Sequence, residues 1–202
     1  MKKIINRALL VLAAAMLIAS SATAFEFDDI QFWVGSGPNQ AALVIDWNDG
    51  ISPESLAWGF RWDSTATGAD MLSAIGAADS WLAVDGSVGP YGLFVNGISY
   101  YLGAGSTHDQ TTPADWSQSW SYWVGDSAAS PNWTSSQVGA SSRLLADNCW
   151  DGWSFTSWDA SYNPITPPGV PVAAPVPEPS SLLALASGLM SLGGLVLRRR
   201  IS

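Results

Sequence analysis

Hydrophobic and polar positions divide the chain into two apolar ends and a mixed middle section. Ala8–Ser20 and Ser180–Leu197 are runs without a charged side chain, whereas polar and charged residues recur throughout the section between them. Long apolar runs at the ends of a chain are typical of export and membrane segments rather than of folded domains. We therefore look for the folded domain in the middle section.

Two segments of the middle section have the patterns of β-strands. Gln40–Trp47 is largely apolar, which predicts a buried strand. Ser55–Trp62 alternates in character, and its large apolar residues fall on one face. The residues Asn48-Asp49-Gly50 between them are a turn signal, so we expect the two strands to pair as a hairpin-like unit.

One segment has the periodicity of an amphipathic helix. Its apolar positions recur every three or four residues, at Met71, Leu72, Ile75 and Ala78. Thr67 can cap the helix N-terminus, and Asp70 three positions later completes a near capping-box arrangement. The pattern predicts a helix that begins after Thr67 and ends near Asp79.

Three further segments predict strands. Tyr91–Tyr101 has the pattern of two short strands around an Asn96-Gly97 turn, and Ser119–Val124 predicts another strand. Gly152–Trp158 predicts the final strand. Together these elements predict an α+β fold: a mostly antiparallel β-sheet domain with one main helix packed on it.

The order of these elements resembles a known domain. A strand, a capped helix and an Asn-Gly hairpin precede Trp120–Val124, Leu145–Asp147 and Gly152–Phe155, which resembles the C-terminal β-domain of transcobalamin-type proteins and their bacterial surface relatives. The resemblance covers about Ala41 to Phe155. The helical domain that completes the corrinoid pocket of transcobalamins has no counterpart in this sequence, so we expect no bound cofactor.

The N-terminal 24 residues have the features of a signal peptide. A positively charged start precedes the apolar run Ala8–Ser20, which is too short to span a bilayer comfortably. Ala22 and Ala24 form a small-x-small cleavage site, so the mature chain is expected to begin near Phe25.

The C-terminal part divides into three segments after a domain expected at residues 25–159. Residues 160–176 are rich in proline, which predicts an extended linker. Residues 180–197 form an apolar run near the lower length limit of a transmembrane helix. The cluster Arg198, Arg199 and Arg200 follows directly, and positive charge favours the cytoplasmic side, so the acidic domain would lie outside.

The segment 177–202 resembles the PEP-CTERM sorting signal. It carries the motif Pro177, Glu178 and Pro179, then the apolar run, then the arginine cluster. The resemblance implies an exported protein that is anchored transiently in the inner membrane and processed near the motif by an exosortase partner. It also implies a cell-surface or extracellular location and an association with exopolysaccharide or biofilm. A plain tail anchor on a periplasmic domain remains the alternative.

The charge between the two ends is strongly acidic. Residues 25–176 contain 16 acidic side chains and only two basic ones, Arg61 and Arg143. Such a surface repels phosphate, so we expect no nucleic-acid partner. Arg61 lies between two aromatic residues and is expected to pair with an Asp or to stack on an indole, with binding of an anionic sugar as the alternative.

The chain contains 12 Trp residues, all of them in the middle section. Indoles either fill a core or present flat faces to sugar rings, and both interpretations remain open. Six Trp residues lie among Asp, Asn, Ser and Gln and are candidates for a glycan-binding face: Trp116, Trp120, Trp123, Trp133, Trp150 and Trp153. Strand alternation would place Trp116, Gln118 and Trp120 on one face.

Metal and catalytic sites have little support in the sequence. With one histidine, His108, and one cysteine, Cys149, we expect no zinc site, and no disulfide can form within the chain. The segment from Asp46 fails the EF-hand spacing, although an irregular calcium site remains open. No nucleophile or phosphate-loop motif occurs. We expect a non-enzymatic surface or matrix protein; a carbohydrate-binding module and a polysaccharide-modifying enzyme are the alternatives.

Overall fold

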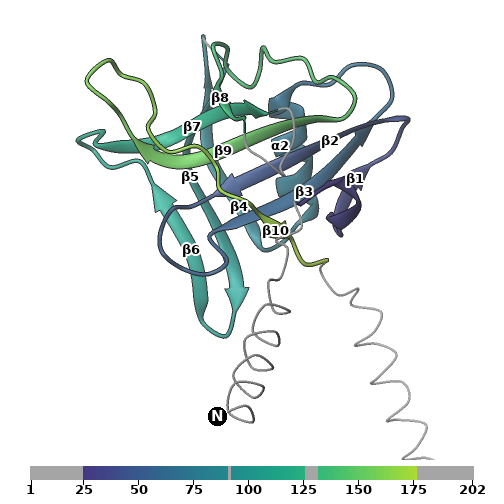
Figure 1. Ribbon diagram of the computed structural model, residues 1–202, viewed down its shortest axis with the longest axis horizontal. Helices are drawn as coiled ribbons and strands as arrows, with labels where there is room; N and C mark the ends of the chain where they lie inside the picture. Colours follow the sequence, from purple (N-terminus) through teal and green to yellow (C-terminus); the bar gives the residue numbers. More distant parts are fainter. Residues whose placement is uncertain (1–24, 91, 126–131, 177–202) are drawn as a thin grey trace, which may run out of the picture.

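In a computed structural model of the protein, residues 25–90, 92–125 and 132–176 are described, and they form two β-sheets around one α-helix (Figure 1). The predicted signal peptide with Ala22 and Ala24, the sorting motif Pro177–Pro179 and the cluster Arg198–Arg200 lie outside the described residues. Within the part of the chain that is described, no helix is long and apolar enough to cross a membrane.

The larger sheet grows from the predicted hairpin-like unit. β2 (Asn39–Asp46) and β3 (Ser55–Trp62) pair antiparallel over their full lengths, and most residues of both strands are buried. β9 (Cys149–Ser157) then pairs parallel with β2, and β7 (Gln118–Gly125) pairs antiparallel with β9. The predicted mixed α+β class, with mostly antiparallel pairing, is confirmed.

Short strands complete the edges of the larger sheet. β8 (Thr134–Ser135) pairs with the end of β7, which leaves most of β7 without a neighbour on that side among the described strands. β1 (Trp33–Gly35) and β10 (Val172–Ala173) both pair parallel with β3, one at each end of it. The predicted final strand is therefore β9, and one further strand follows it.

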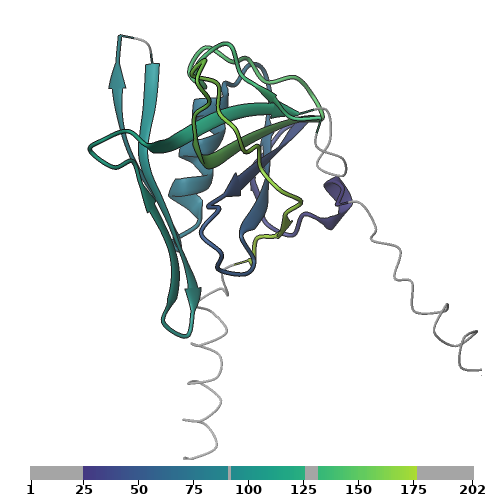
Figure 2. The same ribbon diagram turned by 60° about the vertical axis from the view of Figure 1, so that its left-hand side comes forward.

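The smaller sheet corrects the predicted Asn96-Gly97 turn. β5 (Gly92–Gly103) runs through both residues as one long strand between β4 (Leu82–Gly89) and β6 (Ser106–Thr111). The pairing with β4 shifts at Asp85/Gly86, and there Asn96 donates its amide to Asp85 Oδ2 at 2.8 Å. The dipeptide marks a β-bulge, so the turn prediction was wrong. Figure 2 shows the two ends of this sheet projecting beyond the larger sheet.

The helix lies between the two sheets, where its local sequence signals place it. α2 (Gly68–Ala78) begins after Thr67, whose hydroxyl accepts the backbone N–H of Asp70, while the Asp70 carboxylate accepts the N–H of Thr67. Met71, Leu72 and Ile75 are buried against strands of both sheets. A cap of this kind stabilises a helix by about 1 kcal/mol.

Tryptophan forms much of the core and also links its layers. The Trp47 indole donates its N–H to the carbonyl of Ile98 at 2.9 Å, which joins the larger sheet to the smaller one. The Trp58 indole donates to Asp79 Oδ2 at 2.9 Å, which joins β3 to the end of α2. Both indoles are fully buried. A large side chain with one donor suits such a position, because the donor is satisfied while the ring fills space.

The proline-rich segment 160–176 packs along the domain instead of extending away from it. The Ser154 hydroxyl donates to the carbonyl of Thr166, and the backbone N–H of Gly169 donates to Asp46 Oδ2, both at 2.6 Å. The N–H of Ala174 bonds the carbonyl of Ala57, and Ala174 is fully buried. The packed unit therefore continues beyond Asp159 to Ala174.

Candidate functional site

The structure separates the six candidate tryptophans. Trp116 is 60% exposed, and Trp133 is partly buried. Four are buried, with 5% or less of each side chain exposed: Trp120, Trp123, Trp150 and Trp153. The expected face of Trp116, Gln118 and Trp120 is not formed, because Trp116 lies in a turn before β7 begins. The core interpretation therefore holds for most of this set.

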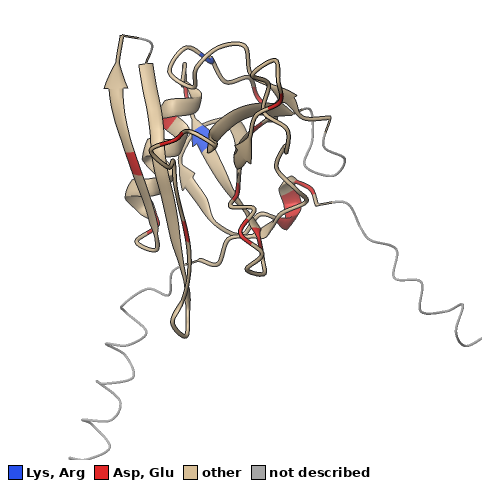
Figure 3. Cartoon of the chain, turned by 90° about the vertical axis from the view of Figure 1, so that its left-hand side faces the viewer, with Lys and Arg blue, Asp and Glu red and all other residues tan. Residues whose placement is uncertain are grey.

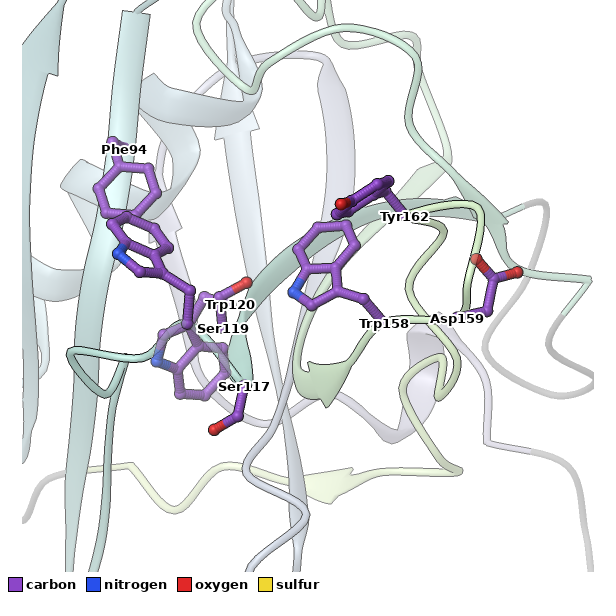
Figure 4. Close-up of a pocket in the computed structure, with 8 residues that line it drawn as sticks. Phe94, Ser117, Ser119, Trp120, Trp158, Asp159 and Tyr162 are labelled. Atoms are coloured by element: carbon purple, nitrogen blue, oxygen red, sulfur yellow. The ribbon is translucent and has the colours of Figure 1, made fainter.

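A different group of aromatic residues lines a cleft with a volume of about 630 Å³. Figure 4 shows Phe94 on one side of this space and Trp158 with Tyr162 on the other. Eight residues line it: Phe94, Trp116, Ser117, Ser119, Trp120, Trp158, Asp159 and Tyr162. We call this space the aromatic cleft. It lies between β5 of the smaller sheet, β7 of the larger sheet and the segment after β9.

A turn before β7 positions one wall of the aromatic cleft. The backbone N–H of Trp116 donates to the carbonyl of Pro113 at 3.0 Å. Asp115 Oδ1 accepts the backbone N–H and the hydroxyl of Ser117, and these hydrogen bonds lower the pKa of the Asp115 carboxyl. The Trp116 indole then packs against the Phe94 ring, with 5.6 Å between ring centroids. One turn thus holds an exposed indole beside a strand of the other sheet.

A second turn positions the opposite wall. Asp159 Oδ1 accepts the backbone N–H groups of Ser161 and Asn163, both at 2.8 Å. The hydrogen bonds from Asn163 are the main reason that the pKa of the Asp159 carboxyl is lowered. This loop presents Tyr162, which is 85% exposed, next to Trp158, which is 38% exposed.

The backbone at both walls is unusual. Trp116 and Tyr162 have φ angles of 56° and 62°, in the left-handed region. Bulky residues rarely adopt this conformation, which costs about 1–3 kcal/mol and is concentrated at functional sites. The other described non-glycine residues with positive φ are Asn48, Ala104 and Asn148. The only aromatic residues in this group therefore line the same cleft.

Sequence patterns identified two lining residues, Trp116 and Trp120, but missed Phe94, Trp158 and Tyr162. Strand periodicity says nothing about which distant loops meet in space, so no alternation rule could bring these residues together. A usable signal does exist in the turns. Asp115 and Asp159 each precede a polar residue by two positions and accept its N–H, and each lies within three residues of an exposed aromatic side chain.

The carboxylates of Asp159 and Asp151 accept hydrogen bonds within the fold. Asp159 is the one carboxylate among the described lining residues of the aromatic cleft, and its oxygens already accept several hydrogen bonds. Asp151 is fully buried and accepts the hydroxyl of Tyr122, with Arg143 Nη2 at 3.5 Å. Burial raises the pKa of Asp151, and burial together with the Asp151 charge raises that of Tyr122.

The single histidine and the single cysteine lie in separate parts of the fold. His108 is fully buried and stacks on Trp47, with its ring nitrogens 2.9 Å from Asp49 Oδ2 and from the carbonyl of Pro53. Burial, reinforced by the Asp151 charge, raises the pKa of the Cys149 thiol to about 11, so the thiol is protonated at neutral pH.

The remaining candidate groups are used within the fold. Asp46 accepts the N–H groups of Asn48 and Gly169, and burial raises the pKa of its carboxyl. The described residues contain no group of three or more acidic, His or Cys side chains that could hold a metal ion. Arg61 stacks on Trp33, with its guanidinium 4.7 Å from the ring centroid. Figure 3 shows acidic residues spread over the described chain.

Comparisons with known proteins match the C-terminal end of the chain. Residues 175–200 match the PEP-CTERM protein-sorting motif. The search of curated proteins gave no match. One solved structure, from Ruminococcus gnavus and described in terms that suggest metal binding, covers 60% of this chain and 100% of its own, with 15% identity and a TM-score of 0.42.

The transcobalamin-type resemblance of the core is not tested by these comparisons and stays a prediction. The sorting motif, by contrast, agrees with the motif, apolar run and arginine cluster recognised in residues 177–202. Such signals imply export, transient anchoring by the C-terminal tail and processing by an exosortase. The chain is therefore an exported protein that carries a PEP-CTERM sorting signal.

Proposed function

We propose that this exported protein binds polysaccharide at the cell surface or in the extracellular matrix through the aromatic cleft. The observation that carries the proposal is the pair of exposed aromatic residues, Trp116 and Tyr162, held at strained backbone positions on opposite walls of the cleft. Exposed aromatic surface of this kind marks a binding site, because burying it against a partner is favourable. We further propose that the partner is the exopolysaccharide of the producing cell, in keeping with the sorting signal.

Sugar chemistry fits the two kinds of groups in the cleft. Pyranose rings present C–H groups on their faces, which pack against the flat faces of indole and phenol rings. Their hydroxyls need hydrogen-bond partners, which the hydroxyls of Ser117 and Ser119 and the carboxylate of Asp159 can provide. A purely apolar ligand would leave these polar groups unpaired, so the lining favours an amphipathic ligand.

We propose that the protein binds without catalysis. Glycosidases need two carboxyl groups about 5–9.5 Å apart on either side of the scissile bond. Asp159 has the only carboxyl group among the described lining residues of the aromatic cleft. This carboxylate accepts backbone N–H groups of the loop that contains Tyr162. Detectable release of reducing ends from the polysaccharide by the purified protein would contradict this part of the proposal.

The test uses the mature protein purified from its producing cells and the exopolysaccharide of the same cells. Trp116→Ala and Tyr162→Ala should each weaken binding at least about tenfold, because each removes an exposed ring worth about 1.5 kcal/mol or more of buried contact. Binding is measured by calorimetry and by quenching of tryptophan fluorescence.

Tyr101→Ala provides the matched control. Tyr101 is 46% exposed and lies on β5, as Phe94 does, but seven residues further along the strand, about 23 Å away. This variant should bind like the wild type. If the wild-type protein fails to bind, or if Tyr101→Ala weakens binding as much as Trp116→Ala does, the cleft is not a polysaccharide site.

A further inference from the structure

We infer that the cleft takes a neutral glycan chain of at least two sugar units, with one part against the aromatic walls and the next in a polar extension of the same cleft. This inference rests on the proposed function and deepens it. It is carried by the continuity of two cavities, by a buried indole N–H without a partner, and by the absence of cationic side chains among the described lining residues.

The polar extension is a second cavity of about 440 Å³. It shares four lining residues with the aromatic cleft: Phe94, Trp120, Trp158 and Tyr162. Away from these, it is lined by β7, by the segment 135–140 with Ser135, Ser136 and Gln137, by Leu93 and Val95 of β5, and by Asn163 and Pro164. Tyr162 therefore lies at the junction of an apolar space and a polar space. A ligand that fills both must change from ring faces to hydroxyl contacts along its length.

One buried donor on the lining of the polar extension has no hydrogen-bond partner among the described residues. It is the indole N–H of Trp153, a side chain that is 4% exposed. Such a donor is costly to leave unpaired, and a sugar hydroxyl can accept from it after a small side-chain adjustment. The Ser121 hydroxyl is also unpartnered, but it lies on the opposite face of the sheet, because Ser121 pairs with Ser154 whereas Trp153 pairs with Tyr122.

Charge decides between neutral and anionic glycans. Neither cavity has an Arg or Lys among its described lining residues, and the one charged lining residue is Asp159. Carboxylates and sulfates are usually bound by Arg, whose fork of donors matches their oxygens. The two arginines of residues 25–176 are engaged elsewhere, Arg61 on the Trp33 ring and Arg143 with Asp151. An anionic sugar would meet repulsion and no cation.

The size of the combined space sets the minimum length. Cavities of about 300–1,000 Å³ enclose most of a drug-sized ligand, which is larger than one sugar ring. The aromatic cleft and the polar extension each fall in this range, at about 630 and 440 Å³. A single sugar would occupy one of them and leave the other to water. We therefore expect affinity to rise with chain length until both spaces are filled.

The experiment titrates the mature protein from its producing cells with neutral β-1,4-glucose oligomers of one to six units and with oligogalacturonates of the same lengths. The tetramer of glucose should bind at least about tenfold more tightly than the monomer. The oligogalacturonates should bind at least about tenfold more weakly than glucose oligomers of equal length in 20 mM salt. This difference should shrink in 0.5 M salt, where exposed charges are screened.

A pair of glutamine variants tests the polar extension. Gln137→Ala should weaken binding of the tetramer about threefold to tenfold, because Gln137 is an exposed amide on the lining of the extension. Gln31→Ala is the matched control, because Gln31 is also exposed but lies before β1, outside both cavities. It should leave all binding unchanged.

The outcomes separate the two levels of the proposal. If neither oligomer series nor the native polysaccharide binds, the proposed function itself fails. If oligogalacturonates bind as tightly as the glucose series in a Trp116-dependent way, the cleft binds glycan but the inference of a neutral ligand is overturned. If affinity does not rise beyond one unit, or if Gln137→Ala and Gln31→Ala behave alike, the two-part site is overturned.

Discussion

The core and the aromatic cleft both contain large aromatic side chains, but these side chains have opposite roles in the two regions. In the core, Trp47 and Trp58 occupy or follow regular strand positions, are fully buried, and donate their N–H groups to partners in other layers. In the cleft, Trp116 and Tyr162 occupy turns, are largely exposed, and have left-handed backbones. A high tryptophan content therefore does not indicate a binding surface by itself. In this protein, backbone conformation and exposure distinguish the core residues Trp47 and Trp58 from the cleft residues Trp116 and Tyr162.

Removal of a core indole should have the largest effect on stability and therefore tests this contrast first. Trp58→Ala should lower the free energy of unfolding by about 3–5 kcal/mol, because it leaves a cavity beside Tyr100 and removes the donor to Asp79. Chemical denaturation followed by circular dichroism measures the change. Trp116→Ala is the matched surface substitution and should change the free energy of unfolding by less than about 1 kcal/mol.

Trp58→Phe separates ring packing from hydrogen bonding. It keeps most of the apolar volume but leaves the fully buried Asp79 carboxylate without the indole donor. The expected cost is about 1–3 kcal/mol, smaller than that of the alanine variant. An equal free energy of unfolding for Trp58→Ala and the wild type would show that the Trp58 indole does not stabilise the core.

Local sequence signals predicted the parts of the fold that depend on local chemistry. Thr67 and Asp70 form the predicted cap, and the helix ends before Asp79 as expected. The long apolar run of β2 and the alternation of β3 predicted their pairing, since a chain reversal between them is the shortest route. In each case the deciding interactions are made by residues close in the sequence.

Local sequence signals gave wrong or incomplete predictions where contacts between residues distant in the sequence determine the structure. Asn96-Gly97 favours a turn, but Asn96 bonds Asp85 across a bulge, and the reversal falls where Gly103 and Gly105 adopt positive φ angles. The cleft was missed for the same reason. Its walls come from β5, from the turn before β7 and from the loop after β9, and no local pattern encodes that meeting.

A comparison of two substitutions at Trp116, with a smaller expected effect, tests whether the backbone there is strained. Trp116→Gly should be more stable than Trp116→Ala by about 1 kcal/mol, because glycine tolerates a φ of 56° that costs energy for any residue with a Cβ. Thermal or chemical unfolding of the two variants measures the difference.

The matched control is the same pair at Trp158, which lines the cleft but is not among the residues with positive φ. There the order should reverse, because glycine gains more freedom in the unfolded chain. The same order at both positions would mean that the turn at Trp116 stores no strain, and the distinction between core and cleft would then rest on exposure alone.

The smallest expected effect is the response of the cleft to acid. Hydrogen bonds from Asn163 and Ser161 hold the pKa of Asp159 below its ordinary value of 3.8, so the ordering of the Tyr162 loop by the carboxylate is complete above that pH. It is lost as the pH falls through the lower value of the folded state. Glycan binding should therefore stay constant from pH 6 to about pH 4 and weaken severalfold below it.

Calorimetric titrations from pH 6 to pH 2.5, with circular dichroism at each pH to show that the fold persists, measure this effect. Asp159→Asn keeps a side-chain oxygen that does not titrate, so its binding should lack the decline below pH 4 that belongs to this loop. Asp115 is bonded in the same way by Ser117 on the opposite wall, and a remaining decline in the Asp159→Asn variant would then be assigned to it. Wild-type binding that is flat to pH 2.5 would show that neither carboxylate shapes the cleft, and that the aromatic walls hold their positions through ring packing alone.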